Sequence, residues 1–138
     1  MSTPTSIEQT PRYQQAADVL DSIFGPSWRD KQKETGFKAV DDFQRIAVEH
    51  CYADAWARDT LDRKTRSVSC LSILATQGSW DEFKMHVEAA LINGFTHEDI
   101  FEIVVHFIPY IGVPKSMQAL KAAGEAFQEI FARDAAKS

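Results

Sequence analysis

The segment His86–Pro114 reads HVEAALINGFTHEDIFEIVVHFIPYIGVP, and it decides which fold this chain can form. Apolar residues recur in it at steps of three and four, which is the period of an α-helix packed against its neighbours. Asn93-Gly94 provides a helix stop, and Thr96 can cap the helix that follows. The segment therefore predicts two antiparallel helices joined by a short turn.

The same period extends over most of the 138 residues, and no stretch has the pattern of a strand. We expect an all-α fold, a compact bundle of about six helices around the central antiparallel hairpin. It forms a single domain over residues 11–135, preceded by a flexible tail over residues 1–10. The expected helices run over about 12–24, 37–58, 62–77, 79–93, 96–110 and 114–133.

Several local patterns set these limits. Gly25-Pro26 ends the first helix, Asp62 caps the third, and Gly78 ends it. The stretch at 79–82, SWDE, has the form of a capping box in which the Ser79 hydroxyl accepts from the backbone N–H of Glu82. On the second helix, the side chains expected to face the core are Phe43, Ile46, Ala47, Cys51 and Trp56.

The overall charge excludes several classes of function. The formal net charge is −5, and acidic and basic residues are interspersed, so nothing suggests a surface for nucleic acid or anionic lipid. Hydrophobic residues make up 44% and no apolar run approaches the roughly 18 residues of a membrane span. The N-terminal stretch has no leader pattern. We expect a cytoplasmic protein without nucleic-acid or membrane partners.

The two cysteines do not form a motif. Cys51 and Cys70 stand nineteen positions apart, so a disulfide framework, a C-x-x-C redox pair and a cysteine zinc site are all poorly supported. The simplest expectation is that both are small buried apolar side chains.

Polar side chains interrupt the apolar pattern in the helix over 96–110. Glu98, Glu102, His106 and Tyr110 follow one another at steps of four, so they lie along one face. A carboxylate and an imidazole one turn apart can share a hydrogen bond, which suits acid–base chemistry. Glu102 and His106 can equally form an internally satisfied structural contact, and their spacing alone leaves both interpretations open.

His86 lies on the preceding antiparallel helix, from which it can approach Glu102 and His106. A lone histidine there can also be a packing residue. Together with His50, these side chains could in principle bind a metal, but none belongs to an H-x-x-x-H or H-E-x-x-H pair. We therefore expect no metal site.

The remaining candidates are cationic or aromatic. Arg66 can hold a substrate carboxylate in its fork of donors, or it can pair with an acid such as Glu102. Cys70 lies one turn further along the same side of the helix. Trp56 and Arg58 end the long second helix, where they can line a pocket or simply pack.

An ordered set of motifs resembles the carboxymuconolactone decarboxylase family over roughly residues 40–125. The family pattern has a leucine-aspartate start, a threonine-arginine pair, a histidine, N-G-x-T, an acidic-isoleucine stretch and H-x-x-x-Y-x-G-x-P. The matching residues are Leu61-Asp62, Thr65-Arg66, His86, Asn93-Gly94-Phe95-Thr96, Asp99-Ile100 with Glu102, and His106, Tyr110, Gly112 and Pro114.

The resemblance implies an alkylhydroperoxidase-like all-α fold and a homo-oligomer, a trimer or a hexamer, with pockets between helices and subunits. It implies decarboxylation of a small anionic lactone such as 4-carboxymuconolactone in aromatic-compound catabolism, without a cofactor or metal. The expected catalytic residues are His86, His106 and Glu102. The expected substrate-binding residues are Arg66, Trp56, Arg58, Tyr110 and Cys70.

Two departures bear on the reaction. The alkylhydroperoxidase-like branch carries a C-x-x-C pair where this chain has SWDE at 79–82, which excludes thiol peroxidase chemistry. Where decarboxylases often read Y-G-x-x-W-x-R-P-G-L, this chain reads YADAWARDTL at 52–61. A different reaction, such as an isomerisation or cyclisation in specialised metabolism, therefore stays open. So does a non-enzymatic helical ligand-binding or assembly protein.

Overall fold

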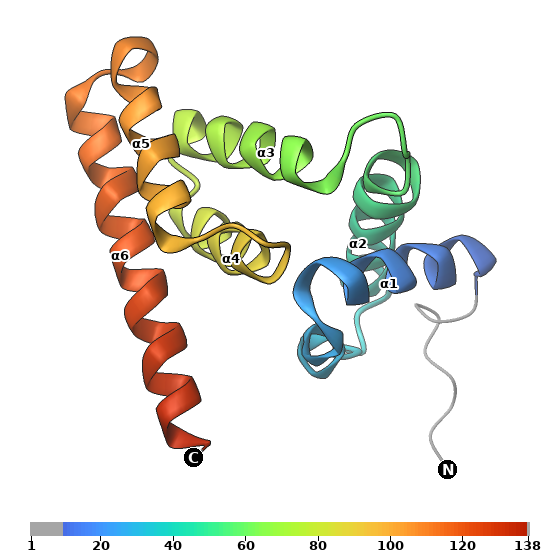
Figure 1. The fold of residues 1–138 in the computed structure, drawn as a ribbon. Coiled ribbons are helices and arrows are strands. Elements are labelled where there is room, and N and C mark those ends of the chain that lie inside the picture. Colours follow the sequence, from blue (N-terminus) through green and yellow to red (C-terminus); the bar gives the residue numbers. More distant parts are fainter. Residues whose placement is uncertain (1–9, 138) are drawn as a thin grey trace. The chain divides into compact units, whose positions relative to one another are not determined.

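The computed structural model describes residues 10–137, whose regular elements are all helices with no strand among them, which confirms the all-α prediction (Figure 1). The chain divides after Leu61 into two compact units, which are described separately below. The expected tail lies, except for Thr10, outside the described residues. The helices are α1 (Pro11–Phe24), η1 (Pro26–Lys31), α2 (Lys38–Val48), η2 (Glu49–Trp56), α3 (Arg63–Gln77), α4 (Trp80–Ile92), α5 (His97–Ile111) and α6 (Val113–Ala136).

The first unit is built on α1, which packs against η1, α2 and η2. Thr10 caps α1 by accepting a hydrogen bond from the Tyr13 backbone N–H (3.0 Å), and Gly25 ends the helix at a φ of 78°. Tyr13 and Ala17 are buried, with Trp28 and Val48 packed against them. Gly25-Pro26 therefore ends the helix as predicted, because glycine accepts the positive φ and proline cannot continue the ladder.

The second long helix corrects one expectation. It forms over nearly the expected range, as α2 followed by a π-helical stretch, η2. The side expected to face the core is exposed, however, with Phe43 72% and Ile46 56% accessible and Ala47 and Cys51 also exposed. Trp56 alone of that set is half-buried. The buried side instead carries two acids, Asp41 and Glu49.

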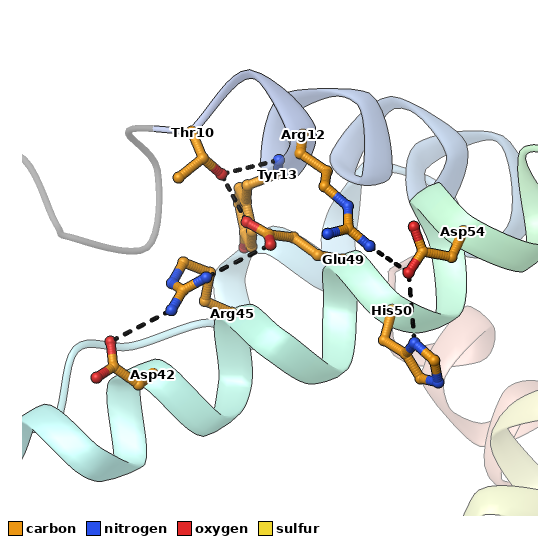
Figure 2. Close-up of polar contacts among 8 residues, drawn as sticks. All are labelled: Thr10, Arg12, Tyr13, Asp42, Arg45, Glu49, His50 and Asp54. Carbon is orange, nitrogen blue, oxygen red and sulfur yellow. Dashed lines mark hydrogen bonds and ion pairs between the residues drawn. The ribbon is translucent and has the colours of Figure 1, made fainter.

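Hydrogen bonds within the unit explain why the acidic side is buried. The Thr35 backbone N–H donates to Asp41 (2.9 Å), and the Thr10 hydroxyl donates to Glu49 (2.6 Å). Arg45 also approaches Glu49, at 3.4 Å. Figure 2 shows the Thr10, Glu49 and Arg45 side chains converging at the start of α1. A buried carboxylate is tolerated where such donors replace water. The apolar periodicity alone therefore predicted the wrong buried face for this helix.

The second unit packs α3, α4 and α5 with α6 around one core (Figure 1). Its largest fully buried side chains are Leu71, Phe83, Val87 and Ile100. The Asp62 side chain caps α3 by accepting from the Thr65 N–H (2.7 Å), as predicted. Thr96 caps α5 in a reciprocal capping box with Asp99, so the acids in this first turn also face the positive end of the helix dipole.

The predicted capping box at Ser79 is absent, since its side chain makes no cap hydrogen bond to α4. Gly78 ends α3 in the left-handed conformation, and the Ser79 N–H then donates back to the Leu74 carbonyl (3.0 Å). This closure holds Ser79 at a ψ of 73°, whereas a helix cap normally has an extended backbone. The end of α3 therefore determines the conformation at the start of α4.

Many large apolar side chains of the second unit face outward. Gly112 alone separates α5 from α6, and these two helices pack side by side (Figure 1). The exposed apolar residues on this pair are Val105, Ile108, Val113, Met117, Leu120 and Phe131. Within residues 10–137, no helix is both long and apolar enough to cross a lipid bilayer.

Candidate active site

A groove between α3 and α5 contains two of the four polar residues expected along one face of α5, Glu102 and His106. Its volume is about 390 Å³, within the range typical of small-molecule sites. Its polar side chains are Ser72, Asp99, Glu102 and His106, and its apolar ones are Val68, Phe95, Ile103 and Phe107. All eight belong to the second unit, so the groove is complete within residues 62–137.

Glu102 and His106 enter the groove from successive turns of α5. Their spacing of four places them on the same face, as predicted, and both are exposed to solvent. Tyr110 follows one turn later and is 75% exposed, with its ring centroid 5.2 Å from that of His106. Within residues 10–137 neither Glu102 nor His106 has a hydrogen-bond partner, so both are available to a ligand.

His86 has a different environment. It lies on α4, half-buried, between exposed Met85 and buried Val87, and it is not among the residues that line the groove. Burial lowers the pKa of His86 to about 4, against a small opposing effect of the Glu82 charge. The ring is therefore neutral at pH 7, where one of its nitrogens can donate a hydrogen bond but the ring carries no positive charge.

Arg66 and Cys70 are both half-buried on α3 and stand one turn apart, as expected. Neither lines the groove as the structure defines it, although Val68 and Ser72 of the same helix do. Cys70 is thus only partly enclosed, and Cys51 in the first unit is exposed, which corrects the expectation that both are buried. Partial desolvation nevertheless raises the pKa of the Cys51 thiol.

Trp56 and Arg58 belong to the first unit, which is described by itself. The Trp56 ring is half-buried and lies 6.3 Å from the Tyr52 ring, centroid to centroid, whereas Arg58 is exposed. The packed position of Trp56 fits the structural role that its sequence context left open.

Sequence reasoning missed the other residues of the groove. Val68 and Ser72 stand four apart on α3, and the Ser72 hydroxyl donates to the Val68 carbonyl (2.7 Å). The same spacing rule that grouped the α5 residues applies to this pair. The helical spacing rule could not place Phe95 in the groove, because Phe95 lies in the turn between α4 and α5. Residues 10–137 include no group of three or more His, Cys, Asp or Glu side chains arranged to hold a metal.

With this fold and groove established, sequence comparison defines the class of protein. The carboxymuconolactone decarboxylase family model matches residues 41–125, and the chain belongs to this family. It is therefore a lyase of the carboxymuconolactone decarboxylase type.

Three individual proteins are similar to it. 4-Carboxymuconolactone decarboxylase of Acinetobacter baylyi is 30% identical over 119 residues, which is 86% of this chain and 89% of the relative. Nitrosuccinic acid decarboxylase of Metarhizium robertsii is 35% identical over 77 residues, 56% of this chain and 54% of the relative. An uncharacterised 15.0 kDa protein of Paracoccus denitrificans is 25% identical over 83% of this chain and 87% of its own length.

Proposed function

We propose that this protein is a cofactor-independent decarboxylase that acts on a small anionic lactone such as 4-carboxymuconolactone, in aromatic-compound catabolism. The observation that carries the proposal is an open groove with Glu102 and His106, in a chain similar over 86% of its length to a 4-carboxymuconolactone decarboxylase.

The chemistry of such a reaction sets the requirements of the site. The carbon–carbon bond to the departing carboxylate breaks, and its electron pair passes through the ring double bond to the lactone oxygen. A proton then adds to carbon as the double bonds return. The site must therefore place hydrogen-bond donors or positive charge at the oxygen that gains charge, and an acid near the carbon.

We assign these roles to the candidate residues, of which Glu102 and His106 line the groove and His86 and Arg66 do not. Glu102 and His106 form the acid–base unit that delivers the proton, since both line the groove. His86 acts as a neutral N–H donor toward the lactone oxygen, because a pKa of about 4 leaves little protonated imidazole at pH 7. Arg66 orients a substrate carboxylate. Tyr110 and Cys70 complete the proposed binding surface.

A second candidate substrate class is an acyclic nitro acid. It is favoured by the 35% identity to a nitrosuccinic acid decarboxylase over 77 residues. Loss of carbon dioxide next to a nitro group also leaves an electron pair that moves onto oxygen, so the same kinds of donor and acid serve. Both substrates are dicarboxylic acids that retain one carboxylate after decarboxylation. The shared class is thus a small diacid with an electron-accepting oxygen group.

We further propose that the enzyme is a cytoplasmic homo-oligomer, a trimer or a hexamer. Its exposed apolar side chains on α5 and α6, including Ile108 and Met117, support assembly because so much apolar surface is seldom left open to water. Both cysteines are free, which fits a reducing compartment. Light scattering tests the assembly, and a monomer at micromolar concentration would contradict it.

The proposed activity is tested by incubating the purified chain with 4-carboxymuconolactone and, separately, with nitrosuccinate while carbon dioxide release is followed. We expect turnover of the lactone well above the uncatalysed rate. Turnover of nitrosuccinate alone would move the assignment to the second class. If the chain turns over neither compound, both proposed substrate classes are ruled out.

A further inference from the structure

Lys64 lies beside Phe95, one of the residues that line the candidate groove. It is the second residue of α3, and its ammonium nitrogen stands 5.3 Å from the centroid of the Phe95 ring, which lines the groove. A cation over an aromatic face is held there by attraction to the ring electrons. The side chain is therefore directed across the α4–α5 turn toward the groove.

The backbone of the same turn leaves room for Lys64. Gly94 has a φ of +103°, and a Cβ built on it would lie 3.3 Å from Lys64 Cε and 3.7 Å from its Nζ. A side chain at this position would be strained by the positive φ and would push the lysine aside. Gly94 thus has a local structural role beyond ending the preceding helix, because it leaves room for the Lys64 side chain.

The local charges leave the Lys64 ammonium available. Among residues 10–137 it has no carboxylate within ion-pair distance. Asp99, which lines the groove, accepts a hydrogen bond from the Thr96 N–H (2.8 Å) in the capping box. That bond and the nearby Lys64 charge lower the pKa of Asp99. Helix stability does not account for the lysine, because a cation in the first turn opposes the helix dipole.

The groove itself needs a cation if it is to take an anion. Its lining carries two carboxylates, Asp99 and Glu102, with His106 as its one other ionisable group and no lysine or arginine. A substrate with two negative charges would be repelled by this lining alone. Lys64 supplies the opposite charge beside Phe95.

We infer that Lys64 binds the carboxylate that the substrate retains, so that the groove selects dicarboxylic over monocarboxylic acids. The retained carboxylate lies at the Phe95 end, and the departing one lies toward Glu102 and His106. This inference rests on the proposed decarboxylase function and assigns one residue to the specificity of that reaction. Lys64 takes no part in bond breaking, and Phe95 and Gly94 position it.

Binding of a non-reactive diacid tests the inference separately from turnover. Succinate and butyrate have the same number of carbon atoms but carry two charges and one. Their affinities would be measured by calorimetry for the unaltered full-length chain and for Lys64→Gln, Lys64→Arg and Lys121→Gln. Lys121 is a matched control, because it is an exposed lysine on α6 that lines a separate hollow beside Trp80.

We expect Lys64→Gln to weaken succinate binding by about tenfold, the usual size of one charge-assisted hydrogen bond. Butyrate can place its one carboxylate at either end of the groove, so its binding should weaken less than that of succinate, and the preference for succinate should fall. Lys64→Arg should retain most of that preference and Lys121→Gln all of it. Raising the salt concentration should weaken succinate binding to the unaltered chain more than to Lys64→Gln.

Three results would overturn the inference: no succinate binding by the unaltered chain, equal affinity for succinate and butyrate, or unchanged succinate binding after Lys64→Gln. Thermal melts of each variant confirm that binding is compared between folded proteins. Carbon dioxide release by the unaltered chain separately tests the proposed function. If the unaltered chain turns over its substrate but its affinity for succinate does not depend on Lys64, the proposed decarboxylase function is supported and only the role of Lys64 is rejected.

Discussion

Glu102 and His106 line one groove from consecutive turns of α5, and neither is hydrogen-bonded to another residue between positions 10 and 137. This geometry distinguishes the two interpretations that their spacing left open. A structural acid–imidazole contact would be buried and internally satisfied. These two side chains are exposed to a groove of ligand size, which favours a role in binding or catalysis.

Replacing either member of this pair should reduce activity without unfolding the protein. We expect His106→Ala and Glu102→Gln each to lower kcat/KM by roughly a hundredfold, the usual cost of losing a general acid or base. Because both side chains are exposed, unfolding free energies should stay within about 0.5 kcal/mol of the original. Glu98→Gln, on the same helix but outside the groove, is the matched control. Full activity in folded His106→Ala would reject the site assignment.

Arg66→Ala should act mainly through KM. A cation that holds a substrate carboxylate does so in the ground state and in the transition state alike, so its loss weakens binding more than it slows the chemical step. Steady-state kinetics with Arg66→Ala and Arg66→Lys separate these effects, and Arg63→Ala removes a neighbouring charge for comparison. A fall in kcat at unchanged KM would place Arg66 in the chemical step instead.

His86 should make stability depend on pH. Its folded pKa of about 4 lies below the ordinary 6.5, so the unfolded chain binds the extra proton between these values. Stability is therefore fully present above about pH 6.5 and falls as pH drops toward 4, by about 3 kcal/mol in total. Urea unfolding across this window measures the slope. His86→Gln should flatten it, and an unchanged slope in that variant would show that other groups cause it.

Thr10 should contribute more to the stability of the first unit than the exposed ion pair of Arg12 with Asp54 does. Thr10→Val removes both the cap of α1 and a hydrogen bond to Glu49, which is only 6% exposed, at a cost of about 1–3 kcal/mol. The pair of Arg12 with Asp54 is exposed, so Arg12→Ala should cost less than about 1 kcal/mol. Figure 2 shows both sets of contacts. Denaturation of the two variants should reproduce this order.

The helices could be predicted largely from local chemistry. Asp62, Gly78 and Thr96 act through bonds to residues within one turn, so the sequence itself contains the information. The buried face of α2 could not be predicted in this way, because it depends on donors from Thr10 and Thr35. The capping box predicted at Ser79 does not form for a related reason, since the end of the preceding helix determines the backbone conformation of Ser79.

The candidate site was predicted only in part. Positions along one helix follow a fixed period, so the shared face of Glu102 and His106 was predictable. The groove also depends on how α3 lies against α5, which brings Val68 and Ser72 opposite that face. No single-helix pattern contains that packing. Lys64 was missed because its position results from a turn, at Gly94 and Phe95, thirty residues further along the chain.

The proposed reaction removes a carboxylate from a small diacid without a metal or organic cofactor. It is tested most directly by the rate of carbon dioxide release from 4-carboxymuconolactone, catalysed by purified chain that has been treated with a chelator and desalted. We expect catalysed release that is undiminished by the chelator and, when the reaction is run in heavy water, one solvent deuteron at a carbon of the product. Release no faster than in buffer alone, by a protein shown to be folded, would contradict it.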